Sequence, residues 1–150
     1  MKVGLVCTRR VVAVPRTTPV LEAARRMRDD HVGDVVVVEE RGEHRVPVGL
    51  VTDRDIVVGL LAKDVEHIAR LNVGDLLISD VITARESEDV TTVLDRMRHY
   101  GVRRVPVVNP DGELVGIFAV DDLLAILAED LSAVVTLFAS GRRREHKQRA

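Results

Sequence analysis

The sequence GLVTDRD at Gly49–Asp55 returns in altered form as GIFAVDD at Gly116–Asp122. The residues upstream of it return as well: Val20–Met27 matches Val90–Met97, and the pair Val11-Val12 matches Val81-Ile82. A repeat at a period of about seventy residues indicates a duplicated unit that buries its apolar face against its twin. We therefore expect two copies related by a pseudo-twofold axis, with two clefts at that axis that are free to diverge.

Each copy has the same predicted order of strand, helix, strand, strand and helix. Thr18 followed by Pro19 is typical of a helix start, and the uninterrupted apolar run Val35–Val38 is typical of a strand buried on both faces. The first copy is predicted to have strands at Val11–Val14, Val35–Val38 and Val46–Val51, with helices at 19–30 and 53–63. The second is predicted to have strands at Val81–Thr83, Val105–Val108 and Leu114–Ala119, a helix through Val90–Met97, a turn at Asn109–Gly112 and a long helix at 121–138.

The segment between the copies is predicted to be a short helix at 65–71 followed by a turn at 72–75. The predicted domains are residues 8–64 and 78–138, joined by a linker at 65–77 and followed by a basic tail at 139–150. The tail has no apolar periodicity, so we expect it to be frayed. The fold class is α/β in the broad sense (α+β), with two β-α-β-β-α repeats that form one module.

Composition excludes several classes of protein. Hydrophobic residues make up 46% and aromatic residues 2%, so the core consists of aliphatic side chains, and stacking of bases on aromatic rings is disfavoured. The net charge of -2 disfavours a general polyanion binder, and the single cysteine, Cys7, excludes an internal disulfide. No apolar run approaches the length of a membrane span, and the start of the chain does not resemble a signal peptide. We expect a cytoplasmic protein without a membrane partner.

Thr52 and Asp55 carry the chemistry of the first repeat. A carboxylate in the first turn of a helix can accept two hydrogen bonds from a ribose cis-diol, and a hydroxyl beside unpaired N–H groups at a helix start suits a phosphate. A purely structural interpretation is also open, because a Thr N-cap with an Asp in the first turn stabilises any helix.

The duplicated order of elements, with Gly-apolar-x-Thr-x-x-Asp at the last strand-to-helix turn, resembles a tandem pair of CBS domains, also called a Bateman module, of the small stand-alone kind. Gly49–Asp55 matches that motif in full, and Arg103–Val107 resembles the family's basic-basic-apolar-Pro-Val strand. The resemblance covers about residues 9–130. It implies a module that binds adenosine-containing ligands, reports them to a partner, and forms disc-like dimers.

The resemblance also implies which residues line the clefts. In the main cleft the apolar side chains would sandwich adenine, Asp55 would hold ribose, and the arginines would meet phosphate. That set is Leu50, Thr52, Arg54, Asp55, Val81, Ile82, Arg103, Arg104 and Pro106. For Arg103 and Arg104, pairing with surface carboxylates is the open alternative.

The second cleft departs from the family pattern. It would draw on Val11, Val12, Ile117, Ala119 and Asp122, with Ala119 where the family has Thr or Ser. Gly33 and Asp34 stand where the other copy has two arginines. A missing hydrogen bond to a charged group is worth about 1.5–3 kcal/mol, but Asp122 could still hold a ribose. We therefore expect this cleft to be empty, weak or suited to the nucleoside portion of a ligand.

The leading hypothesis is a regulatory module and not an enzyme. It would bind AMP, ADP, ATP or an NAD-like ligand, use no cofactor, and act as a homodimer on a protein effector. The sequence has no Gly-rich phosphate loop, Cys-x-x-Cys motif or His pair at metal-ligand spacing, so neither catalytic residues nor a metal site is predicted. The alternative is a nucleic-acid or protein-interaction module that acts through the basic tail.

Overall fold

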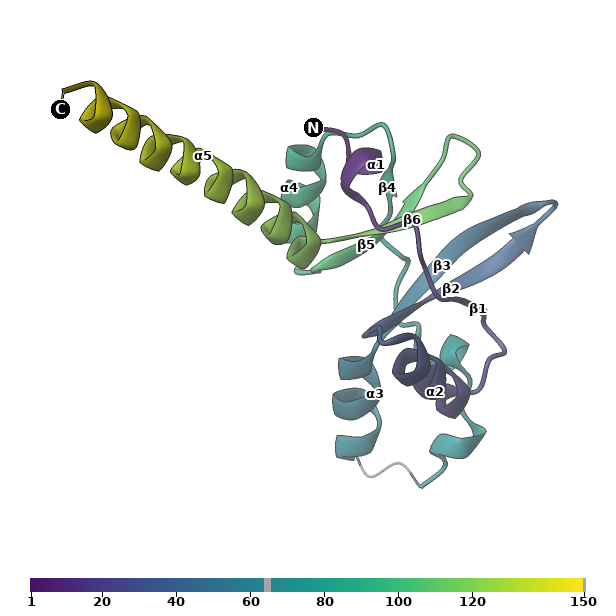
Figure 1. Ribbon diagram of the computed structural model, residues 1–150. Coiled ribbons are helices and arrows are strands. Elements are labelled where there is room, and N and C mark those ends of the chain that lie inside the picture. The colour runs from purple at the N-terminus through teal and green to yellow at the C-terminus, as the bar shows by residue number, and fades with distance from the viewer. Residues whose placement is uncertain (64–65, 150) are drawn as a thin grey trace. The chain divides into compact units, whose positions relative to one another are not determined.

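The computed structural model describes residues 1–63 and 66–149 and contains two three-stranded sheets with flanking helices (Figure 1). The strand order is β1-β2-β3 in one sheet and β4-β5-β6 in the other. The elements in chain order are α1 (Val3–Val6), β1 (Ala13–Pro15), α2 (Val20–Asp30), β2 (Asp34–Arg41), β3 (His44–Thr52), α3 (Asp53–Gly59), three 3₁₀ turns (Leu61–Lys63, Ile68–Arg70 and Val73–Leu76), β4 (Ala84–Arg85), α4 (Val90–Tyr100), β5 (Arg104–Val108), β6 (Leu114–Ala119) and α5 (Val120–Arg149).

The two sheets repeat the same pairing at a shift of seventy residues. Strand β1 runs parallel to β2 with Val14 opposite Val37, and β4 runs parallel to β5 with Ala84 opposite Val107. Helices α2 and α4 each have 11 residues and begin at matching positions. The duplicated unit and the fold class predicted from the sequence are confirmed.

The segment that precedes β1 lies on the last strand of the other repeat. Thr8 N donates to Ile117 O, and Ile117 N donates to Thr8 O, both at 2.9 Å. A Cβ at Gly116 would lie 2.8 Å from Cys7 Sγ and 3.0 Å from Thr8 O, so only glycine permits this approach. The first residues of the chain therefore help to join the repeats.

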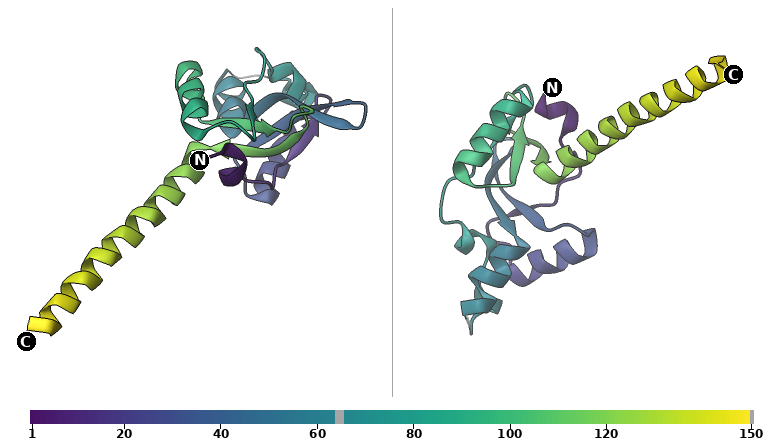
Figure 2. Two further views of the ribbon diagram at one scale, coloured as in Figure 1. Left: turned by 90° about the horizontal axis from the view of Figure 1, so that it is seen from above. Right: turned by 90° about the vertical axis from the view of Figure 1, so that its left-hand side faces the viewer.

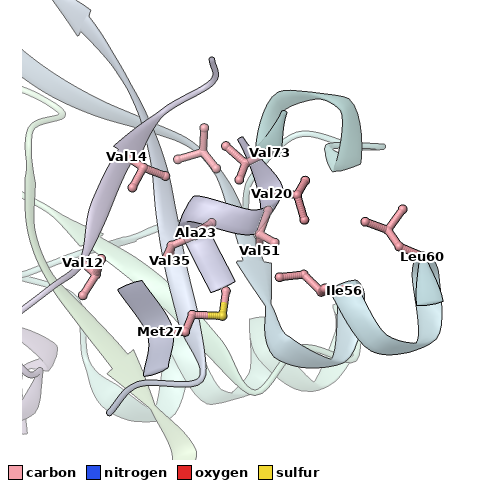
Figure 3. Close-up of a cluster of buried hydrophobic side chains, with 11 residues drawn as sticks. Val12, Val14, Val20, Ala23, Met27, Val35, Val51, Ile56, Leu60 and Val73 are labelled. Carbon is pink, nitrogen blue, oxygen red and sulfur yellow. The ribbon is translucent and has the colours of Figure 1, made fainter. Parts of the chain in front are cut away.

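One apolar cluster fills the space between the first sheet and its helices (Figure 3). Val14 and Val35 come from the sheet, Val20 and Met27 from α2, and Ile56 from α3. Full burial of such a side chain stabilises the fold by about 1.5–3 kcal/mol, so this cluster holds α3 against the sheet. The start of α3 is thereby fixed in position.

Strand β2 is buried on both faces, as its apolar run predicts. Val35 and Val37 face the helices, whereas Val36 and Val38 belong to a second cluster with Leu114 and Ile117 of the other repeat. Packing between the repeats therefore uses alternate residues of one strand.

Several predicted boundaries are wrong. The strand expected at Val11–Val14 begins later, at Ala13, although Val36 N still donates to Val12 O at 2.9 Å. The strand expected at Val81–Thr83 shares no residue with β4, which begins at Ala84. Pro19 and not Thr18 is the N-cap of α2; Thr18 is buried, and its carbonyl accepts from Val73 N at 2.8 Å.

The connection between the repeats is a series of short 3₁₀ turns, not the predicted helix. The α-helical part of the predicted helix at 53–63 ends at Gly59, and a 3₁₀ turn covers Leu61–Lys63. The start of the helix predicted at 65–71 falls on Val65, which lies outside the described residues, and only Ile68–Arg70 form a 3₁₀ turn there.

Helix α5 belongs to a unit of its own. By contacts, the chain divides into one compact unit up to Phe118 and a second from Ala119 onward. The helix predicted at 121–138 is confirmed, but it continues without a break to Arg149 (Figure 2), so the frayed tail is wrong. Its last residues include several Arg, Lys, Glu and Gln, which are good helix formers.

The expectation that no segment approaches a membrane span is also wrong on length. By length and composition, Val120–Gly141 is apolar enough to cross a bilayer, although it contains four acids, two at its start and two at its middle. Glu129 and Asp130 fall at the middle of this segment, where a charged side chain such as Asp costs about 2.5–3.5 kcal/mol in a bilayer. Length permits a span, but these acids oppose it.

An ion-pair network fixes the residues just before α4. Arg96 Nη1 donates to Thr83 O at 2.8 Å and to Glu88 Oε2 at 3.1 Å, and Arg85 N donates to Glu88 Oε2 at 2.7 Å. The hydrogen bond from Arg96 holds the pKa of the Glu88 carboxyl below its usual value. The network thus links the carbonyl of Thr83 to helix α4.

Replacing Glu88 with Gln is expected to lower the free energy of unfolding by about 1–2 kcal/mol at pH 7, because a charge-assisted bond is lost. The difference from the wild type should be full above the ordinary Glu pKa of about 4.3. It should vanish as the pH falls through the lowered pKa of the folded state, where the wild-type carboxylate is itself protonated. Urea unfolding at pH 7 and pH 3 measures this difference.

Asp95→Asn is the control, since Asp95 pairs with Arg98 on an exposed surface and is expected to contribute little. An equal loss from Glu88→Gln at both pH values would contradict the electrostatic account.

Candidate functional site

A cavity of about 540 Å³ lies between the two repeats, within the unit that ends at Phe118. Three segments line it: the turn from β3 into α3, the chain that leads into β4, and the loop between α4 and β5. The lining residues are Gly49, Leu50, Thr52, Asp53, Arg54, Asp55, Leu76, Leu77, Ile78, Ser79, Asp80, Val81, Ile82, Gly101, Val102, Arg103 and Arg104. Eight of the nine residues predicted for the main cleft are in this set.

Thr52 and Asp55 form a reciprocal capping box at the start of α3. Thr52 Oγ1 accepts from Asp55 N at 3.1 Å, and Asp55 Oδ2 accepts from Thr52 N at 2.8 Å. The structural interpretation of this motif is therefore confirmed, yet it does not exclude binding. A carboxylate has about four acceptor positions on two oxygens and the Thr hydroxyl can still donate, so the cap orients both groups and leaves capacity for a ligand.

The turn into α3 is also tied to the start of β2. Asp53 N donates to Gly33 O at 3.0 Å, and Asp53 Oδ1 accepts from Arg54 N at 2.7 Å. Asp53 and Arg54 are exposed and both line the cavity. Asp53 was not predicted as a site residue.

The chain leading into β4 supplies the apolar wall. Val81 and Ile82 are half-buried and line the cavity, as predicted. Leu76–Asp80 line it as well, although the sequence assigned part of this stretch to a linker. Ile78 is fully exposed, at 100%, which is unusual for so apolar a side chain and leaves it available to a ligand.

Gly49 explains why this wall lies so close to the first sheet. A Cβ at Gly49 would lie 2.3 Å from Leu77 Cδ2, so the glycine of the motif admits the leucine. The same relation holds between Gly116 and Cys7 in the other repeat. The two motif glycines were the signal in the sequence that could have identified residues 76–80 as part of the site.

The arginines follow a left-handed turn at the end of α4. Gly101 closes the helix with φ 67°, and Arg103 and Arg104 come directly before the buried part of β5. Arg103 is exposed, whereas Arg104 forms an ion pair with Asp34 of the first repeat. The alternative interpretation, in which an arginine pairs with a carboxylate, is thus confirmed for Arg104. The expected partner was a surface carboxylate, whereas the Asp34 side chain is only 13% exposed.

Pro106 is the one member of the predicted set that does not line the cavity. It is buried inside β5, and the lining from that repeat ends at Arg104. Two residues of strand advance the chain by about 6.6 Å, which carries Pro106 away from the cavity.

Positive and negative charges balance in the lining. Its charged side chains are three carboxylates and three guanidinium groups: Asp53, Asp55, Asp80, Arg54, Arg103 and Arg104. The other lining side chains are mostly aliphatic. The cavity thus combines an apolar wall, a fixed carboxylate and cationic groups, which suits a ligand with a flat apolar part, hydroxyls and a modest negative charge.

The second cleft stays a prediction. Val11, Val12 and Ile117 belong to the unit that ends at Phe118, and Ala119 and Asp122 to the unit that follows. Among the described residues, no group of three or more His, Cys, Asp or Glu side chains could hold a metal ion.

Comparison with known proteins finds one family. The profile of the CBS domain matches residues 3–62 and 73–129. An uncharacterized protein from Methanopyrus kandleri is 34% identical over 129 residues, which cover 84% of this chain and 62% of that protein. The chain therefore spans less than two thirds of the length of this relative.

Two solved structures share the fold and were determined with adenosine-containing compounds. The CBS domain pair of protein MJ0100, in complex with 5′-methylthioadenosine and S-adenosyl-L-methionine, has a TM-score of 0.74 and 25% identity over 87% of this chain and 98% of that chain. A CBS domain protein from Pyrobaculum aerophilum, complexed with AMP, has a TM-score of 0.73 and 28% identity over 86% and 97% of the two chains.

Proposed function

The chain belongs to the CBS-domain family, and we propose that it is a regulatory module that binds an adenosine-containing ligand in the cavity between its repeats. Binding would be reported to a protein effector through a change in the geometry of the module. The observation that carries this proposal is the coincidence in one cavity of an apolar wall, the Asp55 carboxylate and the arginines.

The chemistry of the lining suggests how such a ligand is held. The aliphatic side chains of Leu50, Val81 and Ile82 offer faces to an adenine ring, and the capped Asp55 carboxylate offers acceptors to the ribose hydroxyls. Arg103 offers a planar donor group to a phosphate. The volume of about 540 Å³ is in the range of about 300–1,000 Å³ usual for ligand pockets.

The relatives support the class of ligand. The Pyrobaculum aerophilum protein was solved with AMP and the MJ0100 domain pair with 5′-methylthioadenosine and S-adenosyl-L-methionine, so adenosine is common to all three compounds. We therefore propose adenosine as the part of the ligand that this chain recognises, with AMP, ADP, ATP and an NAD-like compound as the candidates.

We propose no catalytic step for this cavity. The described lining residues with hydroxyl groups are Thr52 and Ser79, and the Thr52 hydroxyl accepts the capping bond from Asp55 N. The function that we propose for the site is binding and release of the ligand.

Adenosine-containing phosphates are expected to raise the melting temperature of the protein, and guanosine and pyrimidine equivalents to raise it less. In the proposed binding mode the base lies on the apolar wall, and backbone groups beside that wall would distinguish the edge of adenine from that of other bases. A ligand at one hundred times its dissociation constant should add about 2.7 kcal/mol to the free energy of unfolding. Scanning calorimetry over AMP, GMP and CMP measures this, and equal stabilisation by all three would contradict recognition of adenine.

Asp55→Ala and Asp75→Ala form a matched pair for the same assay. Asp75 caps a 3₁₀ turn through the same reciprocal box with Asn72, at 2.8 Å, but it does not line the cavity. Both variants should lose about 1 kcal/mol of stability as caps. Only Asp55→Ala should also lose most of the stabilisation by AMP; equal loss in both variants would reduce Asp55 to a structural cap.

We further propose that the module works as a homodimer that forms through α5. Its apolar side chains recur at alternating intervals of three and four residues, which is the spacing of paired helices, and all of them are exposed: Leu124, Leu127, Leu131, Val134 and Phe138. A second copy of the same helix would cover this stripe.

The Glu129 and Asp130 carboxylates of α5 oppose the rival occupant of this stripe, a membrane, because they would face hydrocarbon or anionic lipid.

Light scattering at micromolar concentration is expected to give about twice the protomer mass of 16.6 kDa. Leu131→Asp should shift the protein to monomer, because it places a charge in the apolar stripe, while Thr136→Asp, off the stripe, should not. A monomeric wild type, or one that pellets with anionic phospholipid vesicles, would contradict pairing through α5.

A further inference from the structure

Asp34 and Arg104 occupy the same position in the two repeats and contact each other. Each is the first residue of the middle strand of its sheet, and they are 70 residues apart, which is the shift of the repeat. A residue can meet its own counterpart only where the axis that relates the two repeats passes. The ion pair between Asp34 and Arg104 therefore lies at this axis, and each repeat contributes one of its two charges.

The surroundings of this pair are built to hold it. Arg104 is 31% exposed and Asp34 is 13% exposed, so both groups are partly withdrawn from water. A Cβ at Gly33 would lie 3.2 Å from Arg104 Nη1 and 3.4 Å from Asp53 Oδ2. The glycine before Asp34 thus makes room for the guanidinium group.

The pair changes what Arg104 offers to a ligand. Arg104 lines the cavity, but its charge is compensated by a carboxylate that is better shielded from water than the guanidinium group itself. A phosphate at Arg104 would have to compete with Asp34 for the N–H donors of the guanidinium group. It would also be repelled by the Asp34 carboxylate, and water screens this repulsion less than it would at an exposed site. Arg103 is exposed.

We propose that Asp34 is a specificity-determining residue, which by holding Arg104 restricts the cavity to adenosine ligands of low negative charge. The inference rests on the proposed function and adds the charge class of its ligand. The lining itself has balanced charges, and Asp34 adds one negative charge beside it. Each further phosphate on the ligand is then placed against an unfavourable field, so adenosine and AMP are favoured over ADP and ATP.

Isothermal titration of adenosine, AMP and ATP, without added metal ions, into the full chain and its Asp34→Asn variant tests this inference. Asparagine keeps the shape and an acceptor oxygen for Arg104 but removes the charge. Affinity for adenosine should stay within about twofold, affinity for AMP should rise about threefold, and affinity for ATP should rise about tenfold, which corresponds to about 1.4 kcal/mol.

A double-mutant cycle shows whether Asp34 acts through Arg104. In an Arg104→Gln background, the gain in ATP affinity from Asp34→Asn should shrink to less than about threefold, because the released guanidinium group is absent. A gain that persists in full would overturn the role of Arg104. Asp95→Asn, which removes one acid from an exposed ion pair outside the cavity, is the matched charge control and should change no affinity.

The outcomes separate this inference from the function on which it rests. If the wild type binds none of the three compounds, the proposed function is refuted and the inference falls with it. If the wild type binds adenosine but Asp34→Asn leaves the ratio of ATP to adenosine affinity unchanged, the inference alone is refuted. Should Asp34→Asn fail to fold by circular dichroism, Asp34→Ser removes the same charge with a smaller side chain, and the same ratio decides the result.

Discussion

The close approach of chain segments to the two motif glycines is the constraint on which the site depends. Gly49 admits Leu77, and Gly116 admits Cys7, at distances that a Cβ would forbid. In each case the residue that approaches precedes the first strand of one repeat, and the glycine lies in the last strand of the other. This exchange brings residues 76–82 beside the turn into α3, where they supply most of the aliphatic side chains that line the cavity.

The second constraint is the capping box at the start of α3. One pair of side chains, Thr52 and Asp55, both begins the helix and presents acceptors to the cavity. A motif of this kind serves stability and binding together, because the hydrogen bonds that satisfy the backbone also hold the carboxylate in place. Replacing Asp55 is therefore expected to lower both the stability of the fold and the affinity for the ligand, and the two effects have to be measured separately.

Much of this arrangement was predictable from the sequence, because the repeat fixes which residues are equivalent. The pair Val81-Ile82 and four residues of the motif were expected at one cleft, and they line one cavity; the four are Leu50, Thr52, Arg54 and Asp55. Local sequence patterns predicted the types of the elements better than their ends. Val81–Thr83, for example, has strand propensity, but the strand that pairs in the sheet begins at Ala84.

The remaining features depend on contacts that no local pattern encodes. The pairing of Arg104 with Asp34 joins residues 70 apart, and only the position of the axis brings them together. Pro106 belongs to the matching motif, yet the direction of β5 carries it past the cavity. Helix α5 was expected to fray after Phe138, but helix-forming residues extend it to Arg149.

The central claim is that an adenosine ligand occupies the cavity between the repeats, and a titration of the ¹⁵N-labelled protein with AMP, followed by amide chemical shifts, tests it most directly. The account predicts shifts concentrated in Gly49–Asp55, Leu76–Ile82 and Gly101–Arg104, the three segments that line the cavity. Shifts concentrated on another face of the protein, or no shifts at millimolar AMP, would contradict it.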